Sequence, residues 1–110
     1  MNPRTIIREE TSADEAPIHD LTAIAFADLD VSDHTEQFVI SALRSAGALS
    51  LSLVAELDGR LVGHIAFSPI SISDGTGDWY GVGPLSVLPE FQRQGIGAVL
   101  MREGLDRMRA

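Results

Sequence analysis

The residues best able to do chemistry lie between Val87 and Leu100, where an apolar run gives way to a polar turn and then to an amphipathic helical pattern. The first N–H groups of a helix have no intrahelical partner and lie at the positive end of the helix dipole, so they attract anions. Gly95 and Gly97 fall in this first turn, where each costs about 1 kcal/mol relative to alanine. Close approach of a ligand to the backbone would compensate for that cost, so the segment predicts an anion-binding site. Close packing of the helix on a strand is the structural alternative.

Two common phosphate-binding motifs do not match this segment. It lacks the Gly-Lys-Ser/Thr ending of a P-loop, which argues against nucleoside triphosphate hydrolysis. Leu100 stands where the dinucleotide-binding pattern G-x-G-x-x-G needs its third glycine. A Gly-x-Gly pair alone therefore leaves the identity of the anion open.

The bulk composition predicts one acidic globular domain of 110 residues, 45% hydrophobic and 22% charged, with a net charge of −8. Such a charge repels phosphate backbones, which argues against nucleic acid as a partner. The chain has no cysteine and no apolar run near the ~20 residues that span a bilayer. We therefore expect a cytoplasmic enzyme or binding module without a membrane span.

Acidic residues are concentrated near the start of the chain, where nine fall between Glu9 and Glu36. This acidic region would favour a cationic substrate such as an amine, although a solvated, solubilising surface is the simpler explanation. His19, on the first predicted helix, has no ligand pattern nearby, so we expect no metal site.

The elements that position the glycine segment begin with a short strand at residues 5–8. A helix follows, and its start has two interpretations: a capping box of Ser12 with Glu15, or Asp14 as the N-cap. The second places Pro17 in the first turn, where its missing N–H is harmless, so we prefer it. The core-facing stripe of this helix is Ile18, Leu21, Ala25 and Phe26.

A second helix and three strands complete the predicted order. Asp33 with Glu36 signals the start of the helix, and Gly47 ends it. Strand-like runs follow at residues 51–57, 60–72 and 79–87, separated by turns at Asp58-Gly59 and residues 73–78. Asp-Gly strongly indicates a tight hairpin, because both turn positions need a positive φ. In the final helix, the predicted apolar face consists of Ile96, Leu100, Met101 and Met108, with Gly97 and Gly104 among them.

The complete string from Val87 to Gly97 resembles the pyrophosphate-binding motif of the GCN5-related N-acetyltransferases (the GNAT family), (Q/R)-x-x-G-x-(G/A) preceded by V-x-P. The matching residues are Val87, Pro89, Gln92, Gly95 and Gly97. The order of elements is also similar to that family, and the resemblance covers essentially all 110 residues. It implies an α/β fold of the acyl-CoA N-acyltransferase type, an α+β arrangement with a mixed sheet.

The resemblance further implies acetyl-CoA as cosubstrate and direct transfer of its acetyl group to an amine of a small molecule or peptide. Gly83-Pro84 suits the bulge that the family places in the strand before the loop, although an ordinary bend at a sheet edge explains it equally well. The residues that the resemblance assigns to acetyl-CoA are Leu85, Ser86 and Val87 beside the pantetheine, and Gln92, Arg93, Gln94, Gly95, Ile96, Gly97 and Ala98 in the pyrophosphate loop.

Other polar and aromatic residues have simpler explanations than catalysis. His64 lies mid-strand, where a histidine is more often packed or exposed than a base, and Glu56 precedes a turn, where solvation is simplest. His34 and Glu36 fall where the family often places substrate-contacting residues, but helix capping explains them as well. Trp79 and Tyr80 are suited to line a pocket, although aromatic residues in strands more commonly lie in the core.

The sequence departs from the family pattern after the glycine-loop helix, because the chain ends at Ala110 before the helix that commonly carries the family's acidic tyrosine. The only tyrosine, Tyr80, precedes the motif, so the catalytic residues stay unknown. We expect residues 1–110 to be a single incomplete domain, either a truncated sequence or a fragment completed by a second chain, for example as a homodimer. An N-acetyltransferase is the leading interpretation. A non-catalytic acyl-CoA-binding module or an interaction fragment is the alternative.

Overall fold

The computed structural model describes residues 2–27, 32, 34–70 and 79–109, with four strands, three α-helices and two 3-10 turns among them. In chain order the elements are β1 (Ile6–Glu9), η1 (Ser12–Asp14), α1 (Glu15–Phe26), α2 (Glu36–Ser45), β2 (Leu51–Leu57), β3 (Arg60–Ile70), β4 (Trp79–Val87), η2 (Pro89–Phe91) and α3 (Ile96–Arg109). Asp33 and the turn predicted at residues 73–78 lie outside the described residues.

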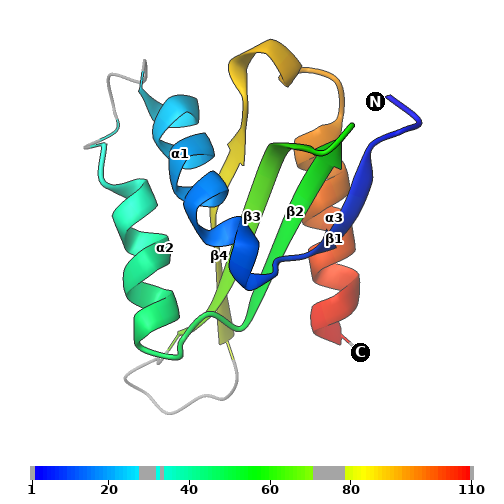
Figure 1. Cartoon of the computed structure of the whole chain (residues 1–110). Helices are drawn as coiled ribbons and strands as arrows, with labels where there is room; N and C mark the ends of the chain where they lie inside the picture. The colour runs from blue at the N-terminus through cyan, green and yellow to red at the C-terminus, as the bar shows by residue number, and fades with distance from the viewer. Residues whose placement is uncertain (1, 28–31, 33, 71–78, 110) are drawn as a thin grey trace.

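The strands form one antiparallel sheet in the order β1-β2-β3-β4. α1 and α2 lie side by side on one face of this sheet, and α3 lies on the other (Figure 1). The predicted α/β class is confirmed. β1 and β4 form the two edges of the sheet, and the glycine segment leaves the sheet directly from the end of β4.

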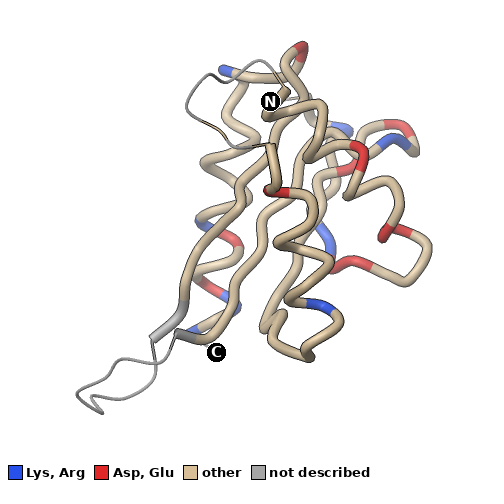
Figure 2. The backbone as a smooth tube through the Cα atoms, turned by 90° about the vertical axis from the view of Figure 1, so that its left-hand side faces the viewer, with Lys and Arg blue, Asp and Glu red and all other residues tan. Residues whose placement is uncertain are grey.

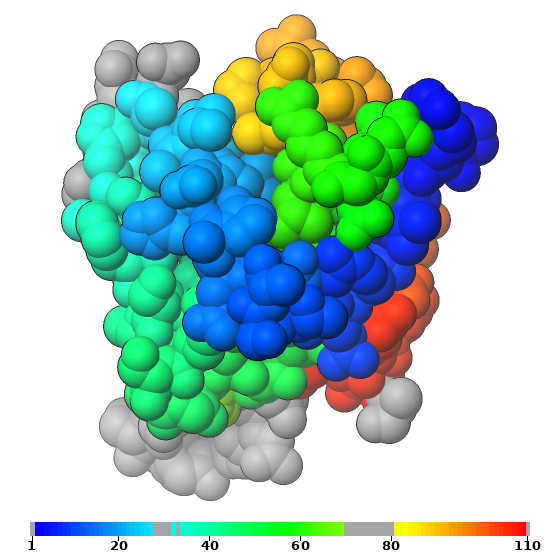
Figure 3. All heavy atoms as spheres, in the orientation of Figure 1, coloured from blue at the N-terminus to red at the C-terminus, as the bar shows by residue number. Residues whose placement is uncertain are grey.

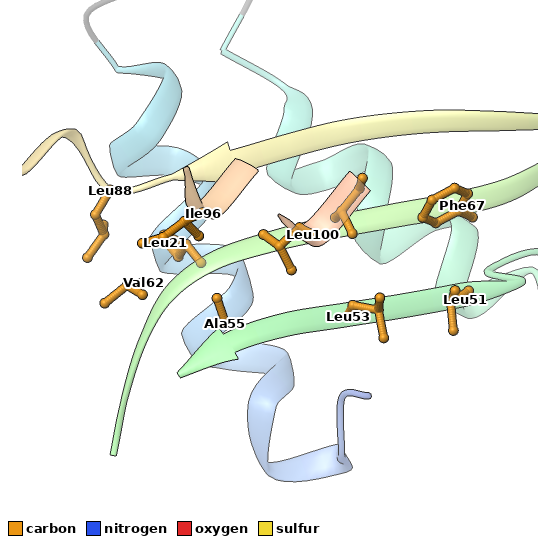
Figure 4. Packing of buried hydrophobic residues seen from close by; sticks show 10 residues of the cluster. Leu21, Leu51, Leu53, Ala55, Val62, Phe67, Leu88, Ile96 and Leu100 are labelled. Atoms are coloured by element: carbon orange, nitrogen blue, oxygen red, sulfur yellow. The ribbon is translucent and has the colours of Figure 1, made fainter. Parts of the chain in front are cut away.

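Apolar side chains fill the space between the sheet and α3. Leu53 of β2, Phe67 of β3 and Leu100 of α3 are at most 1% exposed and belong to one cluster, part of which Figure 4 shows. The predicted apolar face of α3 is confirmed, because Ile96 is also buried and the two methionines are half-buried against the same cluster. A smaller cluster of Ile18, Ile40 and Val54 lies under α1 and α2.

Two turns have the backbone geometry that their sequences predict. Asp58 and Gly59 both have positive φ (52° and 82°), which confirms the hairpin between β2 and β3. At the end of α2, Gly47 has a φ of 67° and donates its N–H to the Arg44 carbonyl at 3.1 Å, while the Ala48 N–H reaches the Leu43 carbonyl at 2.8 Å. These two bonds form a Schellman motif, so Gly47 ends the helix as predicted.

The start of α1 follows the preferred interpretation, with one difference. Asp14 occupies the N-cap position of α1 and Pro17 lies in the first turn. The Asp14 carboxylate, however, accepts the Thr11 N–H at 2.7 Å and so closes a capping box on η1. It also takes two bonds from the Arg8 guanidinium at 2.7 and 3.1 Å, which tie the start of the helix to β1.

A bulge interrupts β4 at the predicted position. Ile65 of β3 pairs with Leu85 and Phe67 with Val82, so one extra residue lies on the β4 side around Gly83-Pro84. Gly83 has a φ of 129°, a value that few residues other than glycine adopt.

Candidate functional site

The glycine segment forms a loop followed by the start of α3. Arg93 and Gly95 both have positive φ (65° and 88°), and they turn the chain from η2 into the helix. The first bond of the helical ladder runs from the Val99 N–H to the Gly95 carbonyl at 3.0 Å. The N–H groups of the four residues from 95 to 98 therefore belong to the first turn and lie at the positive end of the α3 dipole.

The protein's own packing does not explain both glycines of the loop. Gly95 needs its positive φ, but a Cβ on Gly97 would only make ordinary contacts with Leu85 Cδ2 at 3.6 Å and Val87 Cγ2 at 3.9 Å. Close helix–strand packing instead depends on Gly63 of β3, where a Cβ would meet Ile96 Cγ2 at 3.0 Å. Gly97 thus leaves a small space beside β4 at the helix N-terminus, which suits a ligand that approaches the backbone.

The backbone of β4 next to this space has groups that face away from β3. The Leu88 N–H donates to the Val62 carbonyl at 2.9 Å, and residues of an antiparallel pair alternate between bonding to the partner strand and facing away from it. By this alternation the backbone N–H and C=O groups of Ser86 bond to β3, whereas those of Leu85 and Val87 face the free edge of β4. The Val87 carbonyl fits this pattern, because it accepts the Gln92 side-chain N–H at 3.0 Å.

The structure places the predicted residues in two adjoining groups. The first is Leu85, Ser86 and Val87 at the end of β4, and the second is Gln92 to Ala98 in the loop and first turn of α3. Leu85 and Val87 are the nearest neighbours of Gly97, so the two groups meet there. The Arg93 and Gln94 side chains are exposed, whereas the Ser86 side chain is buried with its hydroxyl 3.5 Å from Thr22 Oγ1.

The other polar and aromatic residues singled out in the sequence have different surroundings in the structure. Glu56 is not simply solvated as predicted, because its carboxylate pairs with the Arg8 guanidinium at 2.8 Å. Glu36 accepts the Ser32 hydroxyl at 2.7 Å, and His19 packs edge-on against Phe38 with the ring centroids 5.3 Å apart. His34 is exposed with a φ of 61°. The side chains of Trp79 and Tyr80 lie outside the described part of the structure.

His64 is fully buried, and the residues bonded to it form a polar cluster that the sequence did not reveal. His64 Nε2 lies 2.7 Å from the Ser52 hydroxyl, which also bonds to Glu10, and Glu10 pairs with Arg44 at 2.9 Å. Burial lowers the pKa of His64 to about 4 against the opposing effect of Glu10. The four residues come from four parts of the chain, so no local pattern could indicate that they meet.

Within the residues that the structure describes, no helix is long and apolar enough to cross a membrane, and no group of three or more metal-ligating side chains comes together.

The fold and the loop together define an α/β protein in which a bulged edge strand meets a helix N-terminus. The family model described as "Acetyltransferase (GNAT) family" matches residues 10–110. The chain belongs to the GNAT acetyltransferase family.

Curated relatives carry names from the same family. The uncharacterised N-acetyltransferase YhbS of Escherichia coli K12 is 34% identical over 104 residues, which are 94% of this chain and 59% of the relative. The uncharacterised N-acetyltransferase YjhQ of the same strain is 36% identical over 62 residues, 54% of this chain and 34% of that protein. The chain therefore spans 59% of the length of the YhbS relative.

Solved structures agree with this assignment. A GNAT family acetyltransferase from Brucella melitensis, solved with acetyl-CoA, is 50% identical with a TM-score of 0.93, over 96% of this chain and 68% of that one. YhbS from Escherichia coli, solved with CoA, is 34% identical with a TM-score of 0.83, over 97% of this chain and 58% of that one.

Proposed function

We propose that this chain binds acetyl-CoA between the free edge of β4 and the N-terminus of α3, and that it serves transfer of the acetyl group to an amine. The observation that carries the proposal is the junction itself, where outward-facing backbone groups of Leu85 and Val87 adjoin the small space at Gly97. The relatives solved with acetyl-CoA and with CoA support it, because both match nearly the whole chain.

The pyrophosphate would lie at the first turn of α3. The N–H groups of Gly95 to Ala98 supply donors there, and the exposed Arg93 side chain adds a positive charge. The rest of α3 carries charges of both signs (Figure 2), so attraction is local to its N-terminus. This local attraction matters because the whole chain has a net charge of −8.

The pantetheine arm would run along the free edge of β4. The N–H groups of Leu85 and Val87 are the donors available there, in the manner of an added strand. The exposed Gln92 side chain already donates an N–H to the Val87 carbonyl, so it ties the loop to the strand. Ser86 contributes its backbone to the ladder and its hydroxyl to the buried face.

Acetyl-CoA supplies an activated thioester carbonyl when it is bound. The chain's part in the reaction is to orient this carbonyl at β4 with backbone donors and to accept a proton from the amine. The acidic residues near the start of the chain support a cationic acceptor, either a small amine or a peptide amine.

Binding is tested by isothermal titration of the chain with acetyl-CoA. Gly97→Glu fills the small space and adds a negative charge, whereas Leu105→Glu adds the same charge to a partly exposed position two turns further along α3. We expect Gly97→Glu to weaken binding at least tenfold, about 1.4 kcal/mol, and Leu105→Glu to leave it nearly unchanged. Equal affinities in both variants would refute the proposed site.

Transfer is tested separately with amines of several classes: polyamines, amino sugars and peptide N-termini. Release of the CoA thiol together with acetylated product supports an N-acetyltransferase. Tight acetyl-CoA binding without turnover on any of these amines would favour the non-catalytic binding module instead.

A further inference from the structure

Arg60 is a charged residue of the sheet that contacts the loop before α3 through two different groups. It is the first residue of β3 and follows the Asp58-Gly59 turn. Its Nη2 lies 3.1 Å from Glu90 Oε1, and its guanidinium carbon lies 5.9 Å from the centroid of the Phe91 ring. In Figure 3 the green hairpin of β2 and β3 adjoins the yellow and orange segment that contains η2. Arg60 therefore links this hairpin to the turn that leads into the glycine segment.

The attachment of η2 has an apolar half and a polar half. Phe91 is half-buried against the main apolar cluster, and the buried Leu88 donates its N–H to the Val62 carbonyl at 2.9 Å. Within the described part of the chain, Arg60 is the only residue that bonds to the Glu90 carboxylate, and its guanidinium is the only cation over the Phe91 ring. Loss of Arg60 would remove the polar half of the attachment and leave the apolar half in place.

The glycine segment follows η2 directly, so its backbone depends on the position of η2. The Gln94 side chain reaches back and donates an N–H to the Glu90 carbonyl at 3.5 Å. Between these residues and α3 the chain turns at Arg93 and Gly95, both with positive φ. A shift of η2 would therefore also move the N–H groups at the start of α3, which are the donors of the proposed pyrophosphate site.

Glu90 brings a negative charge into this same turn. Its backbone is within reach of the Gln94 side chain, so an unpaired Glu90 carboxylate would stand close to the proposed pyrophosphate and repel it. The Arg60 guanidinium pairs with this carboxylate and cancels its charge. Arg60 can thus favour an anion at α3 without touching it.

We propose that Arg60 is a positioning residue of the acetyl-CoA site, which holds η2 in place and neutralises Glu90, an inference that rests on the proposed function. A loop that already has its bound position loses less conformational freedom when the ligand arrives, and this raises the affinity. Exposed ion pairs and exposed cation–π contacts are each weak, so the combined effect on affinity should be about threefold to tenfold. The role concerns binding, so the KM for acetyl-CoA should depend on Arg60 and kcat should not.

The position of the loop is tested on the 110-residue chain without any ligand. Hydrogen exchange of the two bonded amides of η2, those of Phe91 and Gln92, should speed up at least threefold in Arg60→Ala. Arg60→Lys, which keeps the positive charge, should restore most of the protection. The matched control is Arg4→Ala, because Arg4 pairs with Asp58 of the same hairpin at 3.2 Å and forms no bond with η2. Equal exchange in wild type and Arg60→Ala overturns the proposal.

The effect on the site is tested by isothermal titration with acetyl-CoA. We expect Arg60→Ala to bind it about threefold to tenfold more weakly than the wild type, with Arg60→Lys in between and Arg4→Ala unchanged. With an amine acceptor, kcat at saturating acetyl-CoA should stay within about twofold of the wild type, and a lower kcat at an unchanged KM overturns the positioning role. Equal binding by wild type and Arg60→Ala also overturns it, while leaving the proposed site intact. A wild-type chain that binds no acetyl-CoA would instead refute the proposed function, and the role of Arg60 with it.

The neutralisation of Glu90 is tested by a double-mutant cycle. In the Arg60→Ala background, Glu90→Gln should recover part of the lost affinity for acetyl-CoA, because the unpaired carboxylate is gone. The recovery should shrink in concentrated salt, which screens the repulsion between exposed charges. An Arg60→Ala/Glu90→Gln chain that binds no better than Arg60→Ala overturns the electrostatic part of the proposal.

Discussion

The two glycines within α3, Gly97 and Gly104, differ in how much room a side chain would have at each position. A Cβ on Gly104 would lie 2.3 Å from Cε2 of the buried Phe67, whereas a Cβ on Gly97 has room. Overpacking costs typically about 1–3 kcal/mol, and alanine's better helix propensity returns up to about 1 kcal/mol. We therefore expect Gly104→Ala to lower the free energy of unfolding in urea by about 1–2 kcal/mol. The matched Gly97→Ala should keep or raise it, and equal effects would contradict this assignment.

His64 should make the stability of the chain depend on pH. Its pKa is lowered from 6.5 to about 4, so the folded state holds the neutral ring while the unfolded state gains a proton below pH 6.5. This contribution is complete above pH 6.5 and is lost as pH falls toward 4. At pH 5 the loss is about 2 kcal/mol, since each pH unit in this window corresponds to about 1.4 kcal/mol.

Urea unfolding at pH 7 and pH 5 measures this dependence. The variant His64→Gln should lose less stability than the wild type over the same interval. The Arg8 guanidinium lowers the pKa of Asp14 to about 2, so loss of that ion pair occurs mainly below this window. An identical pH dependence in wild type and variant would contradict the buried, neutral histidine.

At the scale of elements, features set by neighbouring residues could be predicted from the sequence. The Asp58-Gly59 hairpin, the Gly47 helix end and the glycine-loop junction each depend on backbone angles that few residue types adopt. β2 and β4 begin and end where predicted, and β1 is shifted by one residue. β3 begins where predicted and is described as far as Ile70, while its last two predicted residues lie outside the described part of the chain. Side-chain partners could not be predicted, because Glu56 meets Arg8 and Ser52 meets His64 only once the strands are paired.

The C-terminal end of α2 at Gly47 tests whether a single residue with a positive φ determines where a helix ends. Gly47→Ala places a Cβ in open space but forces a left-handed φ of 67° on alanine. We expect the free energy of unfolding to fall by about 1 kcal/mol. Ser45→Ala, two residues earlier in the same helix end, should change it little, and both are measured by urea unfolding. An unaffected Gly47→Ala would mean that α2 ends for some other reason.

At the scale of the whole molecule, the sheet has two edges of different character. Figure 3 shows the blue N-terminal segment at the right-hand side of the molecule; β1 there is only four residues long, and its Arg8 and Glu9 are charged. β4 is nine residues long and has no charged residue in its sequence. Charge and shortness protect an edge against pairing with another chain, whereas β4 relies on its bulge and Pro84 alone. The open edge that we propose for the pantetheine arm thus also suits a second strand.

We therefore expect the 110-residue chain to self-associate through β4 in the absence of acetyl-CoA. Val82 is 44% exposed on β4, and Val82→Lys adds the charge that protects edge strands, so it should shift the chain toward monomer in concentration-dependent sedimentation velocity. Ile6→Lys, which adds the same charge at a 54% exposed position of β1, should leave the association unchanged. If Ile6→Lys alone prevents association, the chains associate through β1 and not through β4. A wild-type chain that stays monomeric at all concentrations would mean that the bulge and Pro84 protect β4 sufficiently by themselves.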